Sequence, residues 1–241
     1  MLVAIFAPVI APYDPTYQDY SAVLAEPSMA HPFGTDEYGR DILSRIIYGS
    51  RVSLSIGIVA QVVASLVGVT LGAVAGYYGG RIDSVISRIM EIFQAFPDLI
   101  FAMAIMTFLG KGVLNLFIAL GLLTWVRTAR MIRGSVMQLK EKEYIEASRA
   151  CGASTFWIIT KGLVPNCLST IIVLVTLGIP NAIMYEASLS FLGIGIQPPT
   201  PSWGNMISAA QTFISYRPVY SIVPGVAIMI TVIAFNIFGD G

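Results

Sequence analysis

Long stretches without charged side chains dominate the chain and predict helices that cross a membrane. Residues 52–80, 162–185 and 218–239 carry no charge, and residues 92–126 are apolar enough for two crossings interrupted at residues 110–112. Since a helix needs about 20 apolar residues to cross the hydrocarbon core, the pattern predicts five complete spans. We place them at residues 52–80, 91–110, 113–127, 166–190 and 218–239.

The first twelve residues are apolar but too few to cross a bilayer. We interpret residues 1–12 as the outer end of a truncated first span. A cleaved signal peptide is the rival interpretation, but the segment lacks a basic start and a small-residue cleavage site. The predicted fold is therefore an all-α integral membrane protein, a polytopic helical bundle in a single domain, residues 1–241.

Composition agrees with lipid as the main solvent. The chain is 56% hydrophobic and 12% charged, whereas about a quarter of the residues in soluble domains are charged. The formal net charge is zero, so nothing in it favours a nucleic-acid partner. Cys151, Cys167 and His31 match no zinc or haem spacing, and we predict no metal site.

The distribution of basic residues predicts the orientation. If the first span starts inside, nine of the 14 lysines and arginines lie on the cytoplasmic side, which agrees with the positive-inside bias. They are Arg81, Arg88, Arg127, Arg130, Arg133, Lys140, Lys142, Arg149 and Lys161. Residues 127–161 are then a cytoplasmic loop, and residues 13–51 and 194–217 are outer segments.

Small residues recur at every fourth position of the second span, at Ala60, Ala64, Gly68, Gly72, Gly76 and Gly80. Such a face lets another helix approach closely in a membrane. Packing within this chain and packing against a second subunit are both open.

Three carboxylates lie in or near the predicted spans, where each costs about 2.5 to 3.5 kcal/mol. Glu91 follows Arg88 by three residues and suits an ion pair on one helix face. Asp98 follows Pro97, so it either stabilises a helix start or lines a pathway. Glu186 lies about 30 Å along the helix from Asn166, which places it in water near the outer surface. Asp98 and Glu186 are the candidate pathway or gate residues.

Residues 140–165 are too charged at their start to enter lipid, and they favour a short helix outside the membrane. Ala147, Ser148 and Ala150 have small side chains, so one face of that helix is flat. Gly152 suits a C-terminal cap with positive φ. Pro165 marks a break before the next span.

The spacing of Glu146-Ala147-Ser148, Gly152 and Pro165 resembles the EAA loop of bacterial ATP-binding-cassette importer permeases. In that family the loop forms a coupling helix that docks in a groove of the ATPase subunit. The resemblance implies that the docking residues are Tyr144, Glu146, Ala147, Ser148, Ala150, Gly152 and Pro165. The sequence departs from the pattern at Ser148, which replaces the second alanine, and at Gly162 and Val164, where larger aliphatic residues are usual.

Two further stretches, residues 31–51 and 186–206, resemble the C-type permease of the dipeptide, oligopeptide and nickel importers. The resemblance implies a homologous B-type permease, two ATPase subunits that hold ATP and magnesium, an extracytoplasmic substrate-binding protein and a bacterial inner membrane. The implied cargo is a peptide or a related small substrate such as a nickel chelate.

Charged and proline-rich residues mark the two outer segments. Asp36, Glu37, Arg40, Asp41 and Arg45 predict a charged helix on the outer surface, either free or docked to a partner. Residues 197–203 predict a stiff connector that ends in an interfacial tryptophan and either closes over a pathway or braces two helices.

The predicted function is therefore a permease subunit that couples ATPase motion to alternating access. No phosphate-binding Gly-x-x-x-x-Gly-Lys-Ser/Thr loop occurs, so the chain is not predicted to be an ATPase. A self-sufficient channel or secondary transporter is the main alternative, but it predicts a midplane cluster of ion ligands. A membrane-bound enzyme is a weaker alternative, since no convergent catalytic set is evident.

Overall fold

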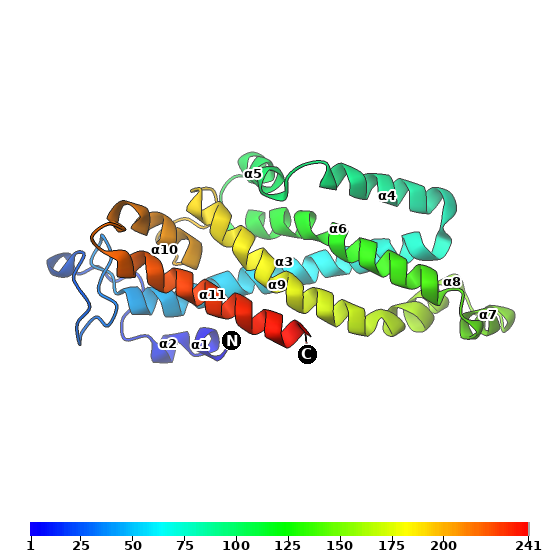
Figure 1. Cartoon of the computed structure of the whole chain (residues 1–241), viewed down its shortest axis with the longest axis horizontal. Helices are drawn as coiled ribbons and strands as arrows, with labels where there is room; N and C mark the ends of the chain where they lie inside the picture. The colour runs from blue at the N-terminus through cyan, green and yellow to red at the C-terminus, as the bar shows by residue number, and fades with distance from the viewer. Residues whose placement is uncertain (241) are drawn as a thin grey trace.

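The computed structural model describes residues 1–240, apart from the side chain of Asp240, and over that range it contains helices and connecting turns without a β-strand (Figure 1). The helices are α1 (Leu2–Ile5), α2 (Ala7–Ile10), α3 (Ile42–Tyr78), α4 (Gly80–Gln94), α5 (Asp98–Leu109), α6 (Val113–Leu139), α7 (Glu143–Ala150), α8 (Thr155–Trp157), α9 (Leu168–Phe191), α10 (Trp203–Ala210) and α11 (Pro218–Asp240). Among the described residues, four helical segments are long and apolar enough to cross a membrane, and the bent pair α4–α5 is a candidate fifth.

Helices α3 and α6 share the most extensive contact of the bundle. A Cβ atom added to Gly72 would lie 2.4 Å from the carbonyl oxygen of Ala129, and one added to Gly68 or Gly76 would lie 2.7 Å from a carbonyl oxygen of α6. The small-residue face therefore packs within this chain, and the two backbones touch because no side chain separates them. Gly80 does not belong to this face, because it starts α4 with φ +50° and has no neighbour within 4 Å.

Helix α6 is much longer than the predicted span at residues 113–127. It continues to Leu139, so the prediction of a loop from residue 127 is wrong. Apolar residues recur at helical spacing after Trp125, and Ala129, Ile132 and Val136 are all buried. Their burial in the bundle outweighs the arginines that interleave with them, because those arginines occupy the other face of the helix.

The predicted span at residues 91–110 is not one continuous helix. The structure divides it between α4 and α5, which meet at an angle of 89°. Pro97 lies at this bend as the N-cap of α5, and a proline cannot continue the hydrogen-bond ladder of α4. The predicted ion pair on α4 is confirmed, with Arg88 Nη1 donating to Glu91 Oε2 at 2.8 Å.

The prediction of a charged helix from Asp36 onward is wrong in part, because residues 36–41 form a turn and a bridge and α3 starts only at Ile42. Asp36, Arg40, Asp41 and Arg45 are buried, and Glu37 is partly exposed. Asp36 is fully buried and accepts a hydrogen bond of 2.6 Å from Arg40 Nε. Arg45 Nη1 donates to the carbonyl oxygen of Pro15 at 3.0 Å, and Asp41 caps α3 by accepting from the Ser44 amide at 2.7 Å. Charges of opposite sign compensate one another here, which makes their burial tolerable.

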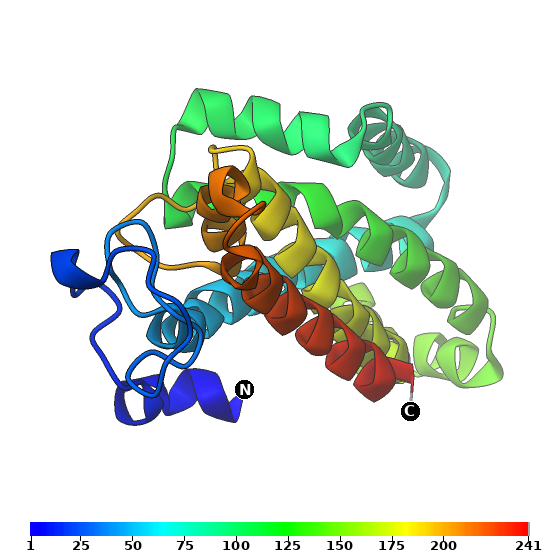
Figure 2. The same ribbon diagram turned by 60° about the vertical axis from the view of Figure 1, so that its left-hand side comes forward.

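Helix α10 and residues 13–41 occupy one end of the bundle, and α7 and α8 occupy the other (Figures 1 and 2). Trp203 starts α10 but does not lie at an interface as predicted, because only 3% of it is exposed. Its ring donates from Nε1 to the carbonyl oxygen of Ile46 at 3.2 Å. The connector therefore braces α3 and α10, one of the two roles predicted for it.

Candidate functional site

Helix α7 is anchored to the bundle by one apolar side chain. Ile145 is fully buried and packs in a cluster with residues of α3, α6 and the segment that leads to α9. A Cβ atom on Gly162 would lie only 3.0 Å from Ile145 Cδ1, so the absence of a larger residue at this position makes room for the anchor. The Tyr144 hydroxyl also donates to the carbonyl oxygen of Gly162, at 3.4 Å.

The opposite face of α7 is exposed. Glu146, Ala147 and Ala150 are all accessible, and the Glu146 carboxylate has no hydrogen bond or ion pair with any residue in the described part of the chain. Ser148 is partly buried and its hydroxyl donates to the Tyr144 carbonyl within the same helix at 2.7 Å. The helix thus presents a flat surface of small side chains and one carboxylate, that of Glu146, without a partner in the described part of the chain.

Gly152 ends this helix as predicted. Its φ is +80°, and the next amide, that of Ala153, donates to the Ser148 carbonyl at 3.0 Å. This six-residue closure is the usual helix stop at a glycine. No atom lies within 4 Å of the position of a Cβ on Gly152, so the backbone conformation and not crowding requires glycine here. A shallow hollow of about 520 Å³ adjoins it, lined by Ala147, Ser148, Cys151, Gly152, Ala153, Ser154 and Trp157.

Pro165 does not interrupt the helical path, so the predicted break takes another form. The chain passes from α8 through a π-helical segment (Ile158–Leu163) and a 3₁₀ segment (Val164–Cys167) directly into α9. The missing amide of the proline is accommodated because these segments change the hydrogen-bond spacing. The Asn166 side chain donates to the Gly162 carbonyl at 2.6 Å, which satisfies that acceptor.

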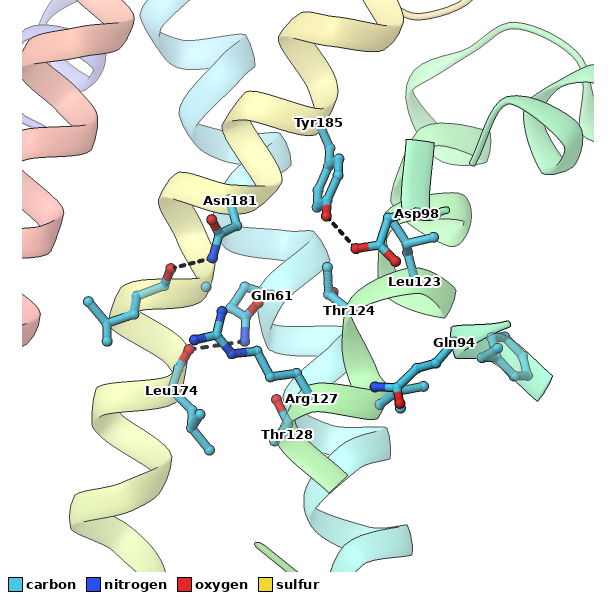
Figure 3. Close-up of a pocket in the computed structure, with 14 residues that line it drawn as sticks. Gln61, Gln94, Asp98, Leu123, Thr124, Arg127, Thr128, Leu174, Asn181 and Tyr185 are labelled. Carbon is cyan, nitrogen blue, oxygen red and sulfur yellow. Dashed lines mark hydrogen bonds between the residues drawn. The ribbon is translucent and has the colours of Figure 1, made fainter. Parts of the chain in front are cut away.

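A polar cavity of about 300 Å³ opens between α3, the α4–α5 bend, α6 and α9 (Figure 3). Its lining comprises Gln61, Phe93, Gln94, Asp98, Leu123, Thr124, Val126, Arg127, Thr128, Leu174, Leu177, Gly178, Asn181 and Tyr185. Most of these residues belong to α3, α6 and α9, which are long and apolar enough to cross a membrane. Polar groups inside such helices call for a functional explanation.

Asp98 lies at one end of this cavity. It is the first residue of α5, where the helix dipole favours a carboxylate, and it accepts a hydrogen bond of 2.5 Å from the Tyr185 hydroxyl. The hydrogen bond from Tyr185 is the one that the structure gives the Asp98 side chain, so the side chain faces the cavity and does not cap the helix. Whether this cavity is part of a pathway stays a prediction.

Arg127 and Gln61 lie toward the other end. Gln61 is 2% exposed and its amide donates to Ser65 Oγ at 3.1 Å and to the Leu174 carbonyl at 3.4 Å. Arg127 extends from α6 toward these groups (Figure 3) and forms no ion pair among the side chains that the structure describes. Sequence reasoning missed Arg127, because we ended the span at residue 127. The signal was the helical spacing of apolar residues that continues beyond it.

Glu186 does not reach water, and that prediction is wrong. It is fully buried, accepting hydrogen bonds from Ser53 Oγ at 3.1 Å and from Ser190 Oγ at 2.8 Å. Ser53 in turn accepts from the amide of Trp203 at 3.3 Å. Glu186 therefore joins α3, α9 and α10 in the packed interior, and its neighbour Tyr185 faces the cavity instead. The α10 segment covers the outer end of α9, which helix length alone does not reveal.

Comparison with known proteins agrees with this architecture. Residues 68–241 match the family model described as "Binding-protein-dependent transport system inner membrane component". The chain belongs to this family. Its members are permease subunits of ATP-binding-cassette importers, and this chain is such a subunit in the inner membrane.

Curated relatives match the permease over its whole length. It is 44% identical to the dipeptide transport system permease protein of Alkalihalophilus pseudofirmus, covering all of this chain and 79% of the relative. It is 41% identical to the glutathione transport system permease protein of Pectobacterium atrosepticum, covering 99% of this chain and 80% of the relative. ATP hydrolysis in such systems takes place in a separate subunit, so the permease is not itself an enzyme.

Solved structures share the fold. A subunit of the MetNI methionine transporter in an inward-facing conformation aligns with a TM-score of 0.68 at 22% identity, covering 81% of this chain and 93% of that one. A chain of an amino acid ABC transporter aligns with a TM-score of 0.61 at 16% identity, over 81% and 91% of the two chains.

Proposed function

We propose that this permease pairs with a homologous B-type permease and two ATPase subunits, and that it imports short peptides. ATP and magnesium bind in the ATPase subunits, and an extracytoplasmic binding protein delivers the cargo. Relatives that carry dipeptides and glutathione in their names support this substrate class. A self-sufficient channel or secondary transporter is not favoured, because the family works with partner subunits.

The observation that carries the proposal is the exposed face of α7. Glu146, Ala147 and Ala150 form a flat surface at one end of the bundle, and only Ile145 on the opposite face is buried in it. A helix held in this way moves with α3, α6 and the segment before α9, because its anchor packs against all three. Docking of an ATPase on the exposed face would therefore transmit motion to the spans.

The end that carries α7 faces the cytoplasm in this proposal. Lys140, Lys142, Arg149 and Lys161 lie in or beside α7, which agrees with the positive-inside bias. Helix α10 and residues 13–41 lie at the opposite end (Figure 1) and would meet the binding protein.

The polar cavity forms this permease's part of the pathway. Asp98 and Arg127 are both exposed on the surface of the isolated chain. Each costs about 2.5 to 3.5 kcal/mol if it faces hydrocarbon at the centre of a span, so lipid is a poor neighbour for this face. A second permease that encloses water with it removes that cost.

Co-purification from membranes tests the assembly. The full-length permease is expressed with its genomic partners and purified through a tag, and the associated proteins are identified by mass spectrometry. We expect a second permease and an ATPase with the wild type. Glu146→Lys should lose the ATPase and keep the second permease, because the charge reversal lies on the exposed docking face.

Glu141→Lys is the matched control. It reverses the same charge in the turn before α7, where the side chain is also exposed, and it should retain the ATPase. Loss of the ATPase from both variants would show a general electrostatic effect and contradict docking through α7. A permease that purifies alone would contradict the importer assembly.

A further inference from the structure

We propose that the cavity between α3, α5, α6 and α9 binds both charged ends of a short peptide, with Asp98 holding the ammonium group and Arg127 the carboxylate. This inference rests on the proposed import of peptides and adds a recognition site within the permease itself. The site takes a zwitterionic peptide of two or three residues with free ends.

The charges of the cavity are of the required kind. Of the fourteen residues that line it, Asp98 and Arg127 are the only two that carry a charge, and they have opposite signs. They do not form an ion pair with each other or with any other side chain that the structure describes. The Asp98 carboxylate has one neutral partner, the Tyr185 hydroxyl, which leaves it free to bind a cation.

The two charges lie toward opposite ends of the cavity. Asp98 bonds to Tyr185, whereas Arg127 extends toward Gln61 and Leu174 (Figure 3). The cavity has a volume of about 300 Å³, at the lower end of the range of small-molecule sites. An extended dipeptide spans only about 7 Å. The volume of the cavity therefore suits a ligand as small as a dipeptide.

The remaining polar groups suit the middle of a peptide. Gln61, Thr124 and Asn181 line the same cavity as the two charges. The Asn181 amide donates to the Leu177 carbonyl at 3.1 Å, and its oxygen is a free acceptor for a peptide N–H. Neutral groups of this kind satisfy a peptide backbone whatever its side chains are. A site built in this way recognises the charged ends and tolerates different sequences.

The test combines ligands in which one charged end is blocked with protein variants in which one charged side chain is replaced. The complex of both permeases and the ATPases is placed in lipid nanodiscs without the binding protein. Binding of labelled dialanine, N-acetyl-dialanine and dialanine amide is then measured by equilibrium dialysis. Because each charge-assisted hydrogen bond is worth roughly a tenfold change in affinity or more, blocking either end should weaken binding to the wild type at least about tenfold.

Each variant should become indifferent to one blocked end only. Asp98→Asn should bind dialanine and N-acetyl-dialanine about equally and still discriminate against the amide. Arg127→Gln should show the reverse. Glu91→Gln and Arg88→Gln, at an exposed ion pair outside this cavity, should behave as the wild type. Equal losses for all three ligands would indicate a structural role for these residues and overturn the inference.

Uptake by proteoliposomes separates this inference from the proposed function. With the binding protein present, the wild-type complex should accumulate dialanine only when ATP is supplied. If it does so but binds no dialanine in nanodiscs, or if both variants discriminate like the wild type, the recognition site is refuted and peptide import stands. If no dialanine enters, the proposed peptide import itself fails.

Discussion

Small residues lie both at the interface between α3 and α6, called the α3–α6 seam below, and on the exposed face of α7, but they serve opposite purposes. On α3, Gly72 lets the backbone of α6 come so close that an added Cβ would lie 2.4 Å from it. On α7, Ala147 and Ala150 are exposed. Both runs consist of small residues, but the run on α3 is covered by α6 and the run on α7 is left accessible. A stripe of small residues therefore indicates close approach without saying what approaches.

The largest loss of stability is expected when a side chain is placed in the α3–α6 seam. Gly72→Val puts a branched side chain against the Ala129 carbonyl, and overpacking against backbone should cost about 3 kcal/mol. We expect low yield in membranes and a clearly lower thermal midpoint in detergent. Gly134→Val is the control, because no atom lies within 4 Å of a Cβ at that position on α6. Equal behaviour of the two variants would contradict the close packing of the seam.

The buried carboxyl of Glu186 should come next. Glu186→Ala leaves the hydroxyls of Ser53 and Ser190 without their acceptor in the interior, and each lost partner costs about 1 to 3 kcal/mol. Glu186→Gln keeps an acceptor oxygen and should be milder. Thermal unfolding of the purified permease measures both. If the alanine variant is as stable as the wild type, Glu186 does not hold α3, α9 and α10 together.

A smaller loss of stability with a large loss of coupling is expected at the end of α7. Gly152→Val places a side chain at φ +80°, which costs about 1 to 2 kcal/mol, and it should reduce ATPase binding. Gly193→Val is matched, since Gly193 has φ +78° and open surroundings at the opposite end of the bundle. It should lose similar stability but keep the ATPase in co-purification. Loss of the ATPase from both variants would trace the effect to destabilisation alone.

The smallest effect is expected at the exposed pair on α4. Arg88 and Glu91 have side chains that are 80% and 56% exposed, and such pairs contribute about 0.2 to 1 kcal/mol. Arg88→Ala should leave the thermal midpoint nearly unchanged at ordinary salt. A large shift would mean that a partner covers this surface during the measurement.

Part of the candidate site could be predicted from the sequence. The end of α7 at Gly152 and the flat face of Ala147 and Ala150 follow from local helix rules. Arg127 could not be placed, because its position on the cavity wall depends on how far α6 continues. The prediction for Glu186 was wrong for a related reason. The number of residues along α9 gives the position of Glu186 in the span, but it does not show that α10 packs over that position.

The order of residues is enough to predict a helical membrane bundle, the positions of its apolar segments and a short polar helix outside them. These features follow from hydrophobicity and local helix signals, which act over a few turns. The bend at Pro97, the burial of the charged residues around Asp36 and the meeting of Asp98 and Arg127 in one cavity become visible in the folded structure alone. Each depends on contacts between segments far apart in the chain, where packing and compensation of charge outweigh the local preference of any single residue.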